Sequence, residues 1–314
     1  MTFIWEDIDM KTIIVSGIAY IDIDALACAI AYKDFLYLKG QKSYAVLSDK
    51  LTVSITDAVK KRWYVIDEEQ ISKDDKVIVV DTSCPESIQE EVNQENIIEV
   101  FDHHAGHEKY WEDKLWNKAH IEYIWACATL IYEQIEKEHL TEKLSMASIN
   151  LLYTAILSNT LYLRAHITHE RDRIAFERLQ KLSDLPNDWP EIYFEDLQKD
   201  VYKDPLTLLA NDTKIADIGG IKIPITQVEL RDTKDFSTKH NDMIVKHLQS
   251  YNMENWLYTA PSISENKNYL ICSSKELQQA LNKDIWATFT GIVGETSELW
   301  LRKEIMKNLM DINF

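Results

Sequence analysis

The stretch "NIIEVFDHH" (residues 96–104) decides the fold, because a buried-strand pattern leads directly into three polar side chains. Its apolar run is short and rich in β-branched residues, which is typical of a strand covered on both faces. The runs "TIIVSGIA" (12–19) and "KVIVVDTS" (76–83) have the same character. Amphipathic stretches separate these runs, and this alternation predicts an α/β domain with a parallel sheet and helices on both faces.

A polar stretch with two prolines, "SDLPNDWP" (183–190), interrupts this pattern and predicts a domain boundary. We therefore expect two domains, residues 1–186 and residues 187–314. Further elements of the first domain are expected as strands at 43–47 and 120–124, a helix opened by Pro85, and helices at 24–40, 54–64, 126–138, 143–158 and 168–183. The expected second domain is smaller and mixed α+β, with a helix at 191–203, a hairpin turning at Gly219-Gly220, strands near 256–259 and 268–273, and a last helix at 298–310.

Charge and composition limit the classes of partner that this chain can bind. The 314 residues include 52 acidic and 34 basic side chains, which gives a net charge of −18. Such a surface repels nucleic acid, whereas a small anion bound through a metal ion stays compatible with it. The four cysteines form no C-x-x-C pair, and no apolar run approaches the ~18 residues of a membrane span. The start of the chain lacks a signal-peptide pattern, so we expect a cytoplasmic protein that does not enter a membrane.

Acidic side chains follow each of the three buried runs, and two imidazoles follow the third. They are Asp22 and Asp24 after the first run, Asp81 after the second, and Asp102, His103 and His104 after the third. A single aspartate at such a place is usually a helix cap or a turn residue. The carboxyl ends of parallel strands share one edge, however, so these groups are expected to converge, and converging carboxylates require a cation. Oxygen ligands with one imidazole favour Mn²⁺ or Mg²⁺.

Four stretches of the first domain, in order, resemble the motifs of the DHH phosphoesterase superfamily. They are "GIAYIDIDAL" (17–26), "VVDTS" (79–83), "FDHH" (101–104) and "ILSNT" (156–160). "LANDTKIADIGGIKIPITQVEL" (209–230) and "LRKEIMKNL" (301–309) resemble the DHHA2 second domain of one branch. That branch contains the manganese-dependent (family II) inorganic pyrophosphatases and the exopolyphosphatase/prune proteins. The "GGH" motif of the nuclease branch is absent, which disfavours oligonucleotide substrates.

The resemblance implies a role for each matching residue. Asp22, Asp24, Asp81 and His103 fall on metal-ligand positions, with Asp81 bridging two ions, and His104 falls on a substrate-contacting, catalytic position. Lys214, Arg302 and Lys303 would grip phosphate groups as the second domain closes over the first. The implied partner is a small phosphorylated anion, the implied metal is Mn²⁺ (or Mg²⁺ or Co²⁺), and a homodimer through an edge strand is compatible with the resemblance.

Two positions depart from the family pattern. Ile18 stands where the family has a histidine ligand, and Asn159 stands where the family has an aspartate. Ile18 cannot bind a metal, whereas Asn159 can still offer an uncharged carbonyl oxygen. Loss of these ligands predicts one firm metal site at Asp24, Asp81, His103 and Asn159, and one weak site at Asp22 and Asp81.

Three functions remain compatible with the sequence. The first is a metal-dependent hydrolase of pyrophosphate, polyphosphate or a small phosphoester, with a degenerate two-metal site. The second is a catalytically impaired family member that binds a phosphorylated ligand. The third is a haloacid-dehalogenase-type phosphatase with Asp22 as nucleophile, although Leu26 stands where that family expects Thr or Val.

Overall fold

The structure is a computed structural model that describes residues 11–63, 67–165 and 168–309. Residues 1–10, 64 and 310, which belong to the predicted chain start and to two predicted helix ends, lie outside the described residues. The chain divides into two compact units, Met1–Leu163 with Thr168–Pro190, and Arg164–Ile167 with Glu191–Phe314. The division therefore falls after Pro190, whereas the sequence suggested a boundary after residue 186.

The first unit is built on a parallel five-stranded sheet with the strand order β2-β1-β3-β4-β5. Its strands are β1 (Thr12–Val15), β2 (Ser43–Ala45), β3 (Lys76–Val80), β4 (Ile97–Asp102) and β5 (Ala119–Ile121). Its α-helices are α1 (Ile23–Leu38), α2 (Asp57–Trp63), α3 (Glu108–Leu115), α4 (Cys127–Lys137), α5 (Met146–Asn159) and α6 (Glu170–Leu182). Short 3₁₀ turns are η1 (Pro85–Ser87), η2 (Gln94–Asn96), η3 (Trp116–Lys118) and η4 (Thr141–Lys143).

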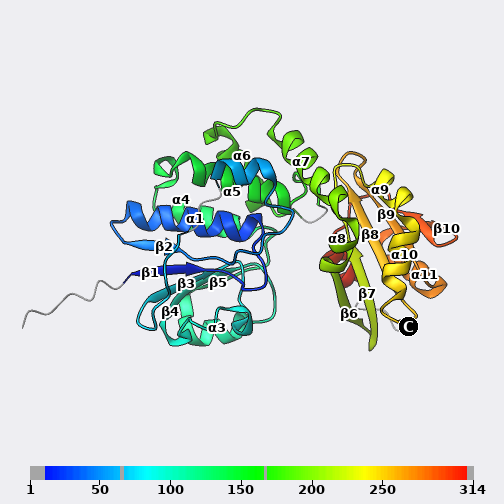
Figure 1. Ribbon diagram of the computed structural model, residues 1–314, viewed down its shortest axis with the longest axis horizontal. Helices are drawn as coiled ribbons and strands as arrows, with labels where there is room; N and C mark the ends of the chain where they lie inside the picture. The colour runs from blue at the N-terminus through cyan, green and yellow to red at the C-terminus, as the bar shows by residue number, and fades with distance from the viewer. Residues whose placement is uncertain (1–10, 64–66, 166–167, 310–314) are drawn as a thin grey trace, which may run out of the picture. The chain divides into compact units, whose positions relative to one another are not determined.

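Helices cover both faces of this sheet, which confirms the predicted fold class. Figure 1 shows α1 and α4 on one face, with α5 farther from the sheet on the same side, and α3 on the other face. The α1 helix starts at its N-cap Asp22 and ends before Gly40, which has a φ of +73°. It is apolar on nearly every side because it packs between the sheet and the helices α4 and α5.

The segment after β3 differs from the prediction. Pro85 opens only the single 3₁₀ turn η1, not an α-helix. In the stretch 85–96 the buried apolar side chains are Ile88 and Val92, which join the core on this face of the sheet. Two such side chains do not form the apolar stripe that tertiary packing requires to stabilise a helix, so the segment folds as turns.

The second unit contains a six-stranded mixed sheet with the order β10-β11-β9-β8-β7-β6. Its strands are β6 (Thr213–Ile218), β7 (Ile221–Gln227), β8 (Leu257–Ser262), β9 (Lys267–Cys272), β10 (Thr288–Thr290) and β11 (Val293–Glu295). The helices after the first unit's last helix are α7 (Trp189–Lys203), α8 (Pro205–Asn211), α9 (Thr233–Lys239), α10 (Asn241–Gln249), α11 (Lys275–Ile285) and α12 (Arg302–Leu309). One core lies under α9 and α10 and another under α11 and α12, so both faces are covered.

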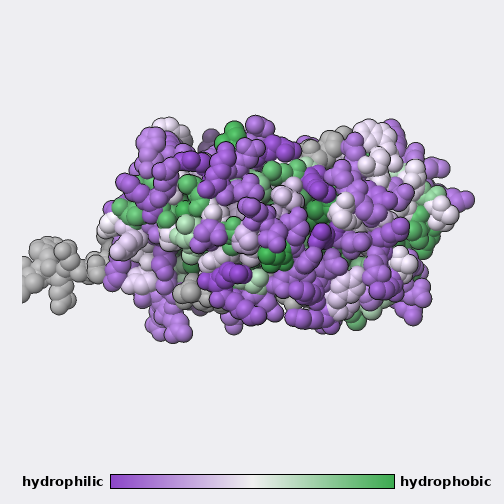
Figure 2. All heavy atoms as spheres, turned by 90° about the horizontal axis from the view of Figure 1, so that it is seen from above, coloured by the Kyte–Doolittle hydropathy of each residue, from purple (hydrophilic) through white to green (hydrophobic). Residues whose placement is uncertain are grey.

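Hydrophilic side chains cover most of the face shown in Figure 2, as expected for a strongly charged chain. Among the described residues, no helix is long and apolar enough to cross a membrane.

Candidate metal centre

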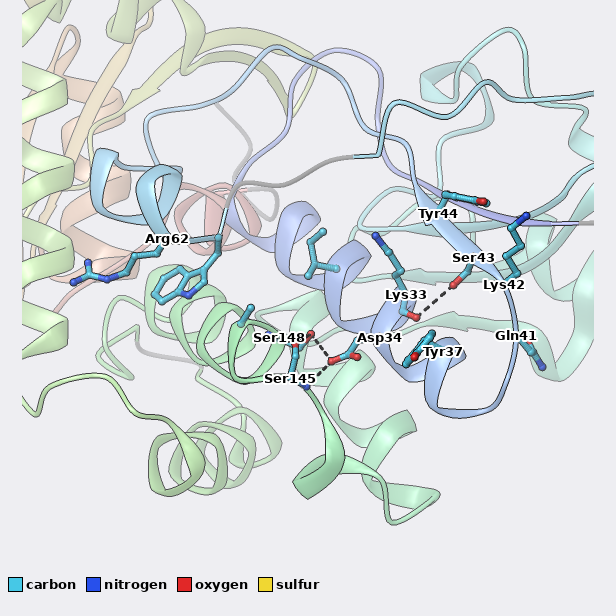
Figure 3. A pocket seen from close by; sticks show the side chains of 13 residues that line it. Lys33, Asp34, Tyr37, Gln41, Lys42, Ser43, Tyr44, Arg62, Ser145 and Ser148 are labelled. Atoms are coloured by element: carbon cyan, nitrogen blue, oxygen red, sulfur yellow. Dashed lines mark hydrogen bonds between the residues drawn. The ribbon is translucent and has the colours of Figure 1, made fainter.

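A cavity of about 400 Å³ lies in the first unit, between the second half of α1, β2, α2 and the start of α5. Figure 3 shows its lining, which includes charged side chains such as Lys33 and Asp34. Lys33 forms an ion pair with Asp67 at 2.7 Å, and Asp34 accepts hydrogen bonds from the backbone nitrogen of Ser145 and the hydroxyl of Ser148. Since these charges are already compensated, the cavity is a weaker candidate than the sheet edge described next.

The carboxyl-terminal edge of the sheet carries the predicted site residues. In the observed strand order β1 and β3 are neighbours, and the chain leaves them toward opposite faces of the sheet. Such a switch point opens a crevice at the strand ends where ligands bind in α/β sheets. Asp22 and Asp24 follow β1 along the chain, and Asp81 follows β3.

The strand predicted at residues 12–19 is shorter in the structure, because β1 ends at Val15 and a loop leads from there to α1. Asp22 is consequently the N-cap of α1, and its Oδ1 accepts a hydrogen bond of 2.9 Å from the backbone nitrogen of Ala25. Asp22 is therefore a helix cap, the usual role of a single aspartate at such a place. Asp24 lies in the first turn of the same helix and is buried.

Asp24 is held by backbone and side-chain donors from two other helices. The backbone nitrogens of Cys127 and Ala128, at the start of α4, each donate to its carboxylate at 2.8 Å. A helix N-terminus favours such an anion. Burial nevertheless raises the pKa of Asp24 to about 7, with the charge of Asp22 adding to the effect. The carboxylate is thus positioned by donors that leave part of its charge uncompensated.

Asp81 has the least compensated carboxylate of this edge. It follows β3 with a φ of +57°, a left-handed conformation that costs free energy in residues other than glycine. Within the described part of the chain its buried Oδ1 has no hydrogen-bond partner. Burial, and then the charges of Asp22 and Asp24, raise the pKa of Asp81 well above its usual range. A proton or a cation is required at this place.

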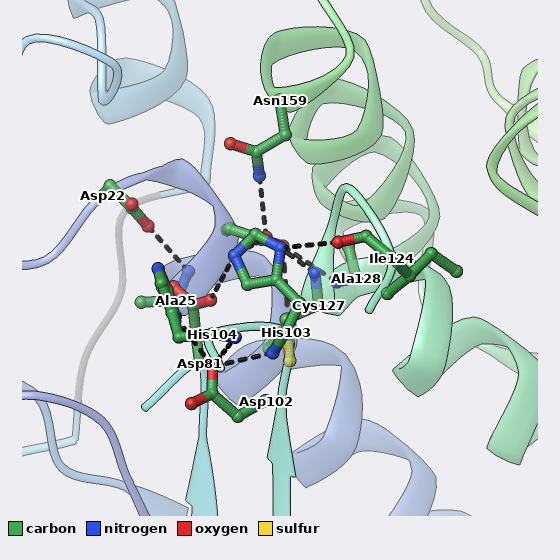
Figure 4. Close-up of polar contacts among 12 residues, drawn as sticks. Asp22, Ala25, Asp81, Asp102, His103, His104, Ile124, Cys127, Ala128 and Asn159 are labelled. Carbon is green, nitrogen blue, oxygen red and sulfur yellow. Dashed lines mark hydrogen bonds and ion pairs between the residues drawn. The ribbon is translucent and has the colours of Figure 1, made fainter. Parts of the chain in front are cut away.

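The imidazole of His103 faces both buried carboxylates. Its Nδ1 lies 3.1 Å from the carbonyl oxygen of Ile124, and because a carbonyl only accepts, Nδ1 carries the proton. The lone pair of Nε2 in the neutral ring then points toward Asp81 Oδ1 at 3.5 Å and Asp24 Oδ2 at 3.9 Å. Figure 4 shows the His103 ring between Asp81 and Ile124. A lone pair and carboxylate oxygens suit a divalent cation between them, and the carbonyl contact is the usual means of orienting a histidine ligand. These residues fit a metal ion.

His104 is fixed by the buried Asp102. One oxygen of Asp102 accepts the backbone nitrogens of His103, at 2.7 Å, and of His104, at 3.1 Å, as well as His104 Nδ1 at 2.8 Å. Burial raises the pKa of Asp102, but the hydrogen bond and charge of His104 outweigh it and lower the pKa overall. The His104 side chain is 60% exposed, so an ionised Asp102 orients an imidazole that solutes can reach. Asp81, His103 and His104 offer ligand atoms within 4.8 Å of one another.

Asn159 and Ile18 occupy the two positions that depart from the family pattern. Asn159, the last residue of α5, donates its side-chain nitrogen to Asp24 Oδ2 at 2.7 Å. This contact uses the amide nitrogen, whereas a metal would require the carbonyl oxygen. Ile18 lies in the loop after β1 with 45% of its surface exposed.

Three groups that shape the site were not expected from the sequence. They are the backbone nitrogens of Cys127 and Ala128 and the carbonyl oxygen of Ile124. Backbone groups leave no signature in side-chain identity, so only the packing of α4 against α1 reveals them. The buried role of Asp102 was also missed, although its place in the Asp-His-His triplet could have indicated it.

The predicted phosphate-gripping residues lie in the second unit. Arg302, the first residue of α12, forms an ion pair of 2.7 Å with Asp212, and its backbone nitrogen donates to Gln227. Lys214 lies in β6, two residues after Asp212. Burial is the largest effect on Asp212 and raises its pKa, while the positive charge of Lys214 lowers it. Burial raises the pKa of Glu229, and the charges of Arg302 and Lys303 oppose that rise. Arg302 thus contacts Asp212, and the charges of Lys214 and Lys303 act on Asp212 and Glu229, respectively.

Comparison with known proteins shows what the first unit is similar to. Residues 12–156 match the family model described as the DHH family, N-terminal domain. This part of the chain is therefore similar to the N-terminal domain of the DHH family.

The relatives extend the similarity beyond that domain. A Bacillus licheniformis protein assigned as a manganese-dependent inorganic pyrophosphatase is 22% identical over 303 residues, 92% of this chain and 97% of the relative. A Lactobacillus delbrueckii protein with the same assignment is 27% identical over 220 residues, 68% of this chain and 69% of the relative.

Solved structures show the same fold. A Methanococcus jannaschii protein assigned to the family II inorganic pyrophosphatases has a TM-score of 0.64 at 18% identity, covering 95% of this chain and 99% of that chain. An exopolyphosphatase-related protein from Bacteroides fragilis has a TM-score of 0.52 at 12% identity, covering 95% and 90%. The chain thus resembles the pyrophosphatase and exopolyphosphatase branch.

Proposed function

We propose that this protein is a metal-dependent hydrolase of a phosphoanhydride or a small phosphoester, similar to the pyrophosphatases and exopolyphosphatases. The observation that carries the proposal is the buried Oδ1 of Asp81, which lies opposite Nε2 of His103 and has no hydrogen-bond partner among the described residues. The DHH domain match and the manganese dependence in the names of the relatives support the same chemistry.

The metal count follows from how each carboxylate is compensated. Asp24, Asp81 and His103 would hold one firm ion, Mn²⁺ by preference, because their potential ligand atoms converge. Asp22 already caps α1, so with Asp81 it would hold a second ion only weakly. Asn159 supports this count, because its amide nitrogen supplies to Asp24 a positive dipole where the family has an aspartate.

The chain's own residues would divide the remaining work. When bound, the metal acts as a Lewis acid and lowers the pKa of a coordinated water. His104 holds a proton on Nδ1 against Asp102 and presents Nε2 to solvent, where it orients the bridging or leaving oxygen. Lys214, Arg302 and Lys303 would neutralise the non-bridging oxygens of a small phosphorylated anion.

A second candidate function is binding of a phosphorylated ligand without rapid turnover. The observation that favours it is the hydrogen bond from Asn159 to Asp24, which stabilises the carboxylate without a second metal ion. Loss of the second ion removes one of the two cations that stabilise the attacking and leaving oxygens in a two-metal hydrolysis.

A substrate and metal panel distinguishes the two functions. Phosphate release is measured from pyrophosphate, polyphosphate and p-nitrophenyl phosphate with Mn²⁺, Mg²⁺ or Co²⁺, and thermal unfolding is followed in parallel. Mn²⁺-dependent release from any of these substrates supports the hydrolase. A silent panel in which pyrophosphate still raises the melting temperature supports the binder, and a panel silent in both measurements contradicts both.

A further inference from the structure

A second group of potential metal ligands lies on the loops that follow β3 and β4. Cys84, Glu86 and His107 offer a sulfur, a carboxylate oxygen and an imidazole nitrogen within 4.8 Å of one another. Cys84 precedes the turn η1, Glu86 lies in it, and His107 is the N-cap of α3. The cluster shares no residue with the metal centre described above.

The packing around this cluster holds its two loops together. The side-chain nitrogen of Trp111 in α3, which is fully buried, donates to the carbonyl oxygen of Ser83 at 2.6 Å. Ser83 precedes Cys84, and Trp111 lies one helical turn after His107, whose carbonyl oxygen accepts from the Trp111 backbone nitrogen. The backbone positions of Cys84 and His107 are therefore fixed relative to each other by a buried contact.

The side chains of the cluster also point toward one another. The Cys84 thiol donates to Glu86 Oε2 at 3.2 Å, so sulfur and oxygen already point at each other. The His107 ring makes no capping hydrogen bond to α3. Cys84 and His107 are half-buried and Glu86 is exposed, so an ion from solvent can reach all three.

We propose that Cys84, Glu86 and His107 form a second, independent metal site that binds Zn²⁺. Thiolate and imidazole ligands favour Zn²⁺, whereas the oxygen-rich centre at Asp81 favours Mn²⁺. On binding, the Cys84 thiol releases its proton to solvent, and the ion takes the proton's place between sulfur and carboxylate. Thiolate and carboxylate together supply two negative charges, which balance the charge of the ion. Three protein ligands leave the fourth tetrahedral position to water.

Co²⁺ titration of the full-length, metal-free protein tests this site. A cobalt–thiolate bond gives a charge-transfer absorption in the near ultraviolet, and ligation by oxygen and nitrogen alone does not. We expect Co²⁺ at saturation to produce this band, with the oxygen-rich centre at Asp81 binding a further equivalent that adds no thiolate band, and Zn²⁺ to remove it. Cys84→Ser should abolish the band, and Glu86→Gln or His107→Ala should weaken Co²⁺ binding by about 10-fold or more.

Matched variants separate this site from the metal centre and from folding defects. Cys272→Ser, which alters a buried thiol of the second unit, should retain the band. Asp81→Asn should retain it too, so failure of the proposed hydrolase function would leave this result unchanged. Absence of the band in the wild-type protein, or its survival in Cys84→Ser, would overturn the proposal. The Glu86→Gln variant keeps the test decisive if Cys84→Ser misfolds, because Glu86 is exposed and its substitution should not disturb folding. Wild-type Co²⁺ affinity in Glu86→Gln would exclude Glu86 as a ligand and would likewise overturn the site.

Discussion

The two units handle concentrated charge in opposite ways. At the sheet edge of the first unit, burial and the charge of Asp22 raise the pKa of Asp24, and burial with the charges of Asp22 and Asp24 raises the pKa of Asp81. One Asp81 oxygen has no hydrogen-bond partner in the described part of the chain. In the second unit, Arg302 is paired with Asp212. Charges of one sign are compensated only by a ligand of the opposite sign, whereas the mixed cluster is compensated by its own residues. The first cluster therefore requires a proton or a cation, whereas the second is compensated without a ligand.

Asp81→Asn should produce the largest effect and separates binding from stability. Mn²⁺ affinity and turnover should each fall by more than about 100-fold, because an anionic ligand is lost. The metal-free protein should melt at a higher temperature, since the amide removes an uncompensated buried charge and asparagine tolerates the left-handed backbone. Calorimetry, phosphate release and thermal unfolding measure the three quantities, with the exposed Asp49→Asn as control. Undiminished activity in Asp81→Asn would refute its assignment.

Arg302→Ala should have the reverse effect on stability. Removing the guanidinium leaves Asp212 without its cation, so the melting temperature of the metal-free protein should fall. Mn²⁺ affinity should stay at the wild-type value, while KM for the phosphorylated substrate rises by about 10- to 100-fold, as expected for a lost charge-assisted hydrogen bond. Lys283→Ala, an exposed position on α11, is the control. A fall in Mn²⁺ affinity with KM unchanged would show that the two clusters do not divide the work in this way.

The double variant Ile18→His with Asn159→Asp tests whether the first cluster has lost two metal ligands of the family pattern. It restores one imidazole and one carboxylate, and Mn²⁺ affinity should rise by about 10- to 100-fold, with a second equivalent bound in calorimetry. The metal-free form should be less stable than wild type, because an aspartate would replace the amide that donates to Asp24. Unchanged affinity and stoichiometry would mean that these positions are not vacated ligand positions.

The smallest effect is the pH dependence of the metal-free protein. The pKa of Asp24 is about 7 in the folded state against 3.8 when unperturbed, so the folded state binds this proton more tightly. The stability contributed by Asp24 should therefore fall as pH rises from about 4 to 7 and then level off. Mn²⁺ should reduce this dependence, since it replaces the proton. Thermal unfolding at pH 5 and pH 8 measures the effect, and Asp24→Asn should reduce the slope, while Asp81 and Glu229, whose pKa values burial also raises, supply the remainder. An equal slope in the Asp24→Asn variant would assign the whole dependence to those other groups.

Much of the fold follows from local sequence patterns. The apolar runs that became β3 and β4 were predicted because strands buried on both faces are continuously hydrophobic. The hairpin of β6 and β7 was predicted from Gly219-Gly220, both of which have positive φ. The helix α3 was not predicted, because in its eight mostly charged residues only Trp111 is buried. That helix depends on the contact of Trp111 with Ser83, which is distant along the chain.

The sequence by itself determined which groups reach the sheet edge, because the carboxyl ends of parallel strands meet whatever the connections between them. It could thus place Asp24, Asp81 and His103 together. Tertiary structure decided how each carboxylate is compensated. The α4 helix supplies backbone donors to Asp24, Asn159 turns its side-chain nitrogen toward Asp24, and Oδ1 of Asp81 has no hydrogen-bond partner within the described residues. The reason is that hydrogen bonding and desolvation depend on distances between distant segments, and side-chain identity alone does not fix those distances.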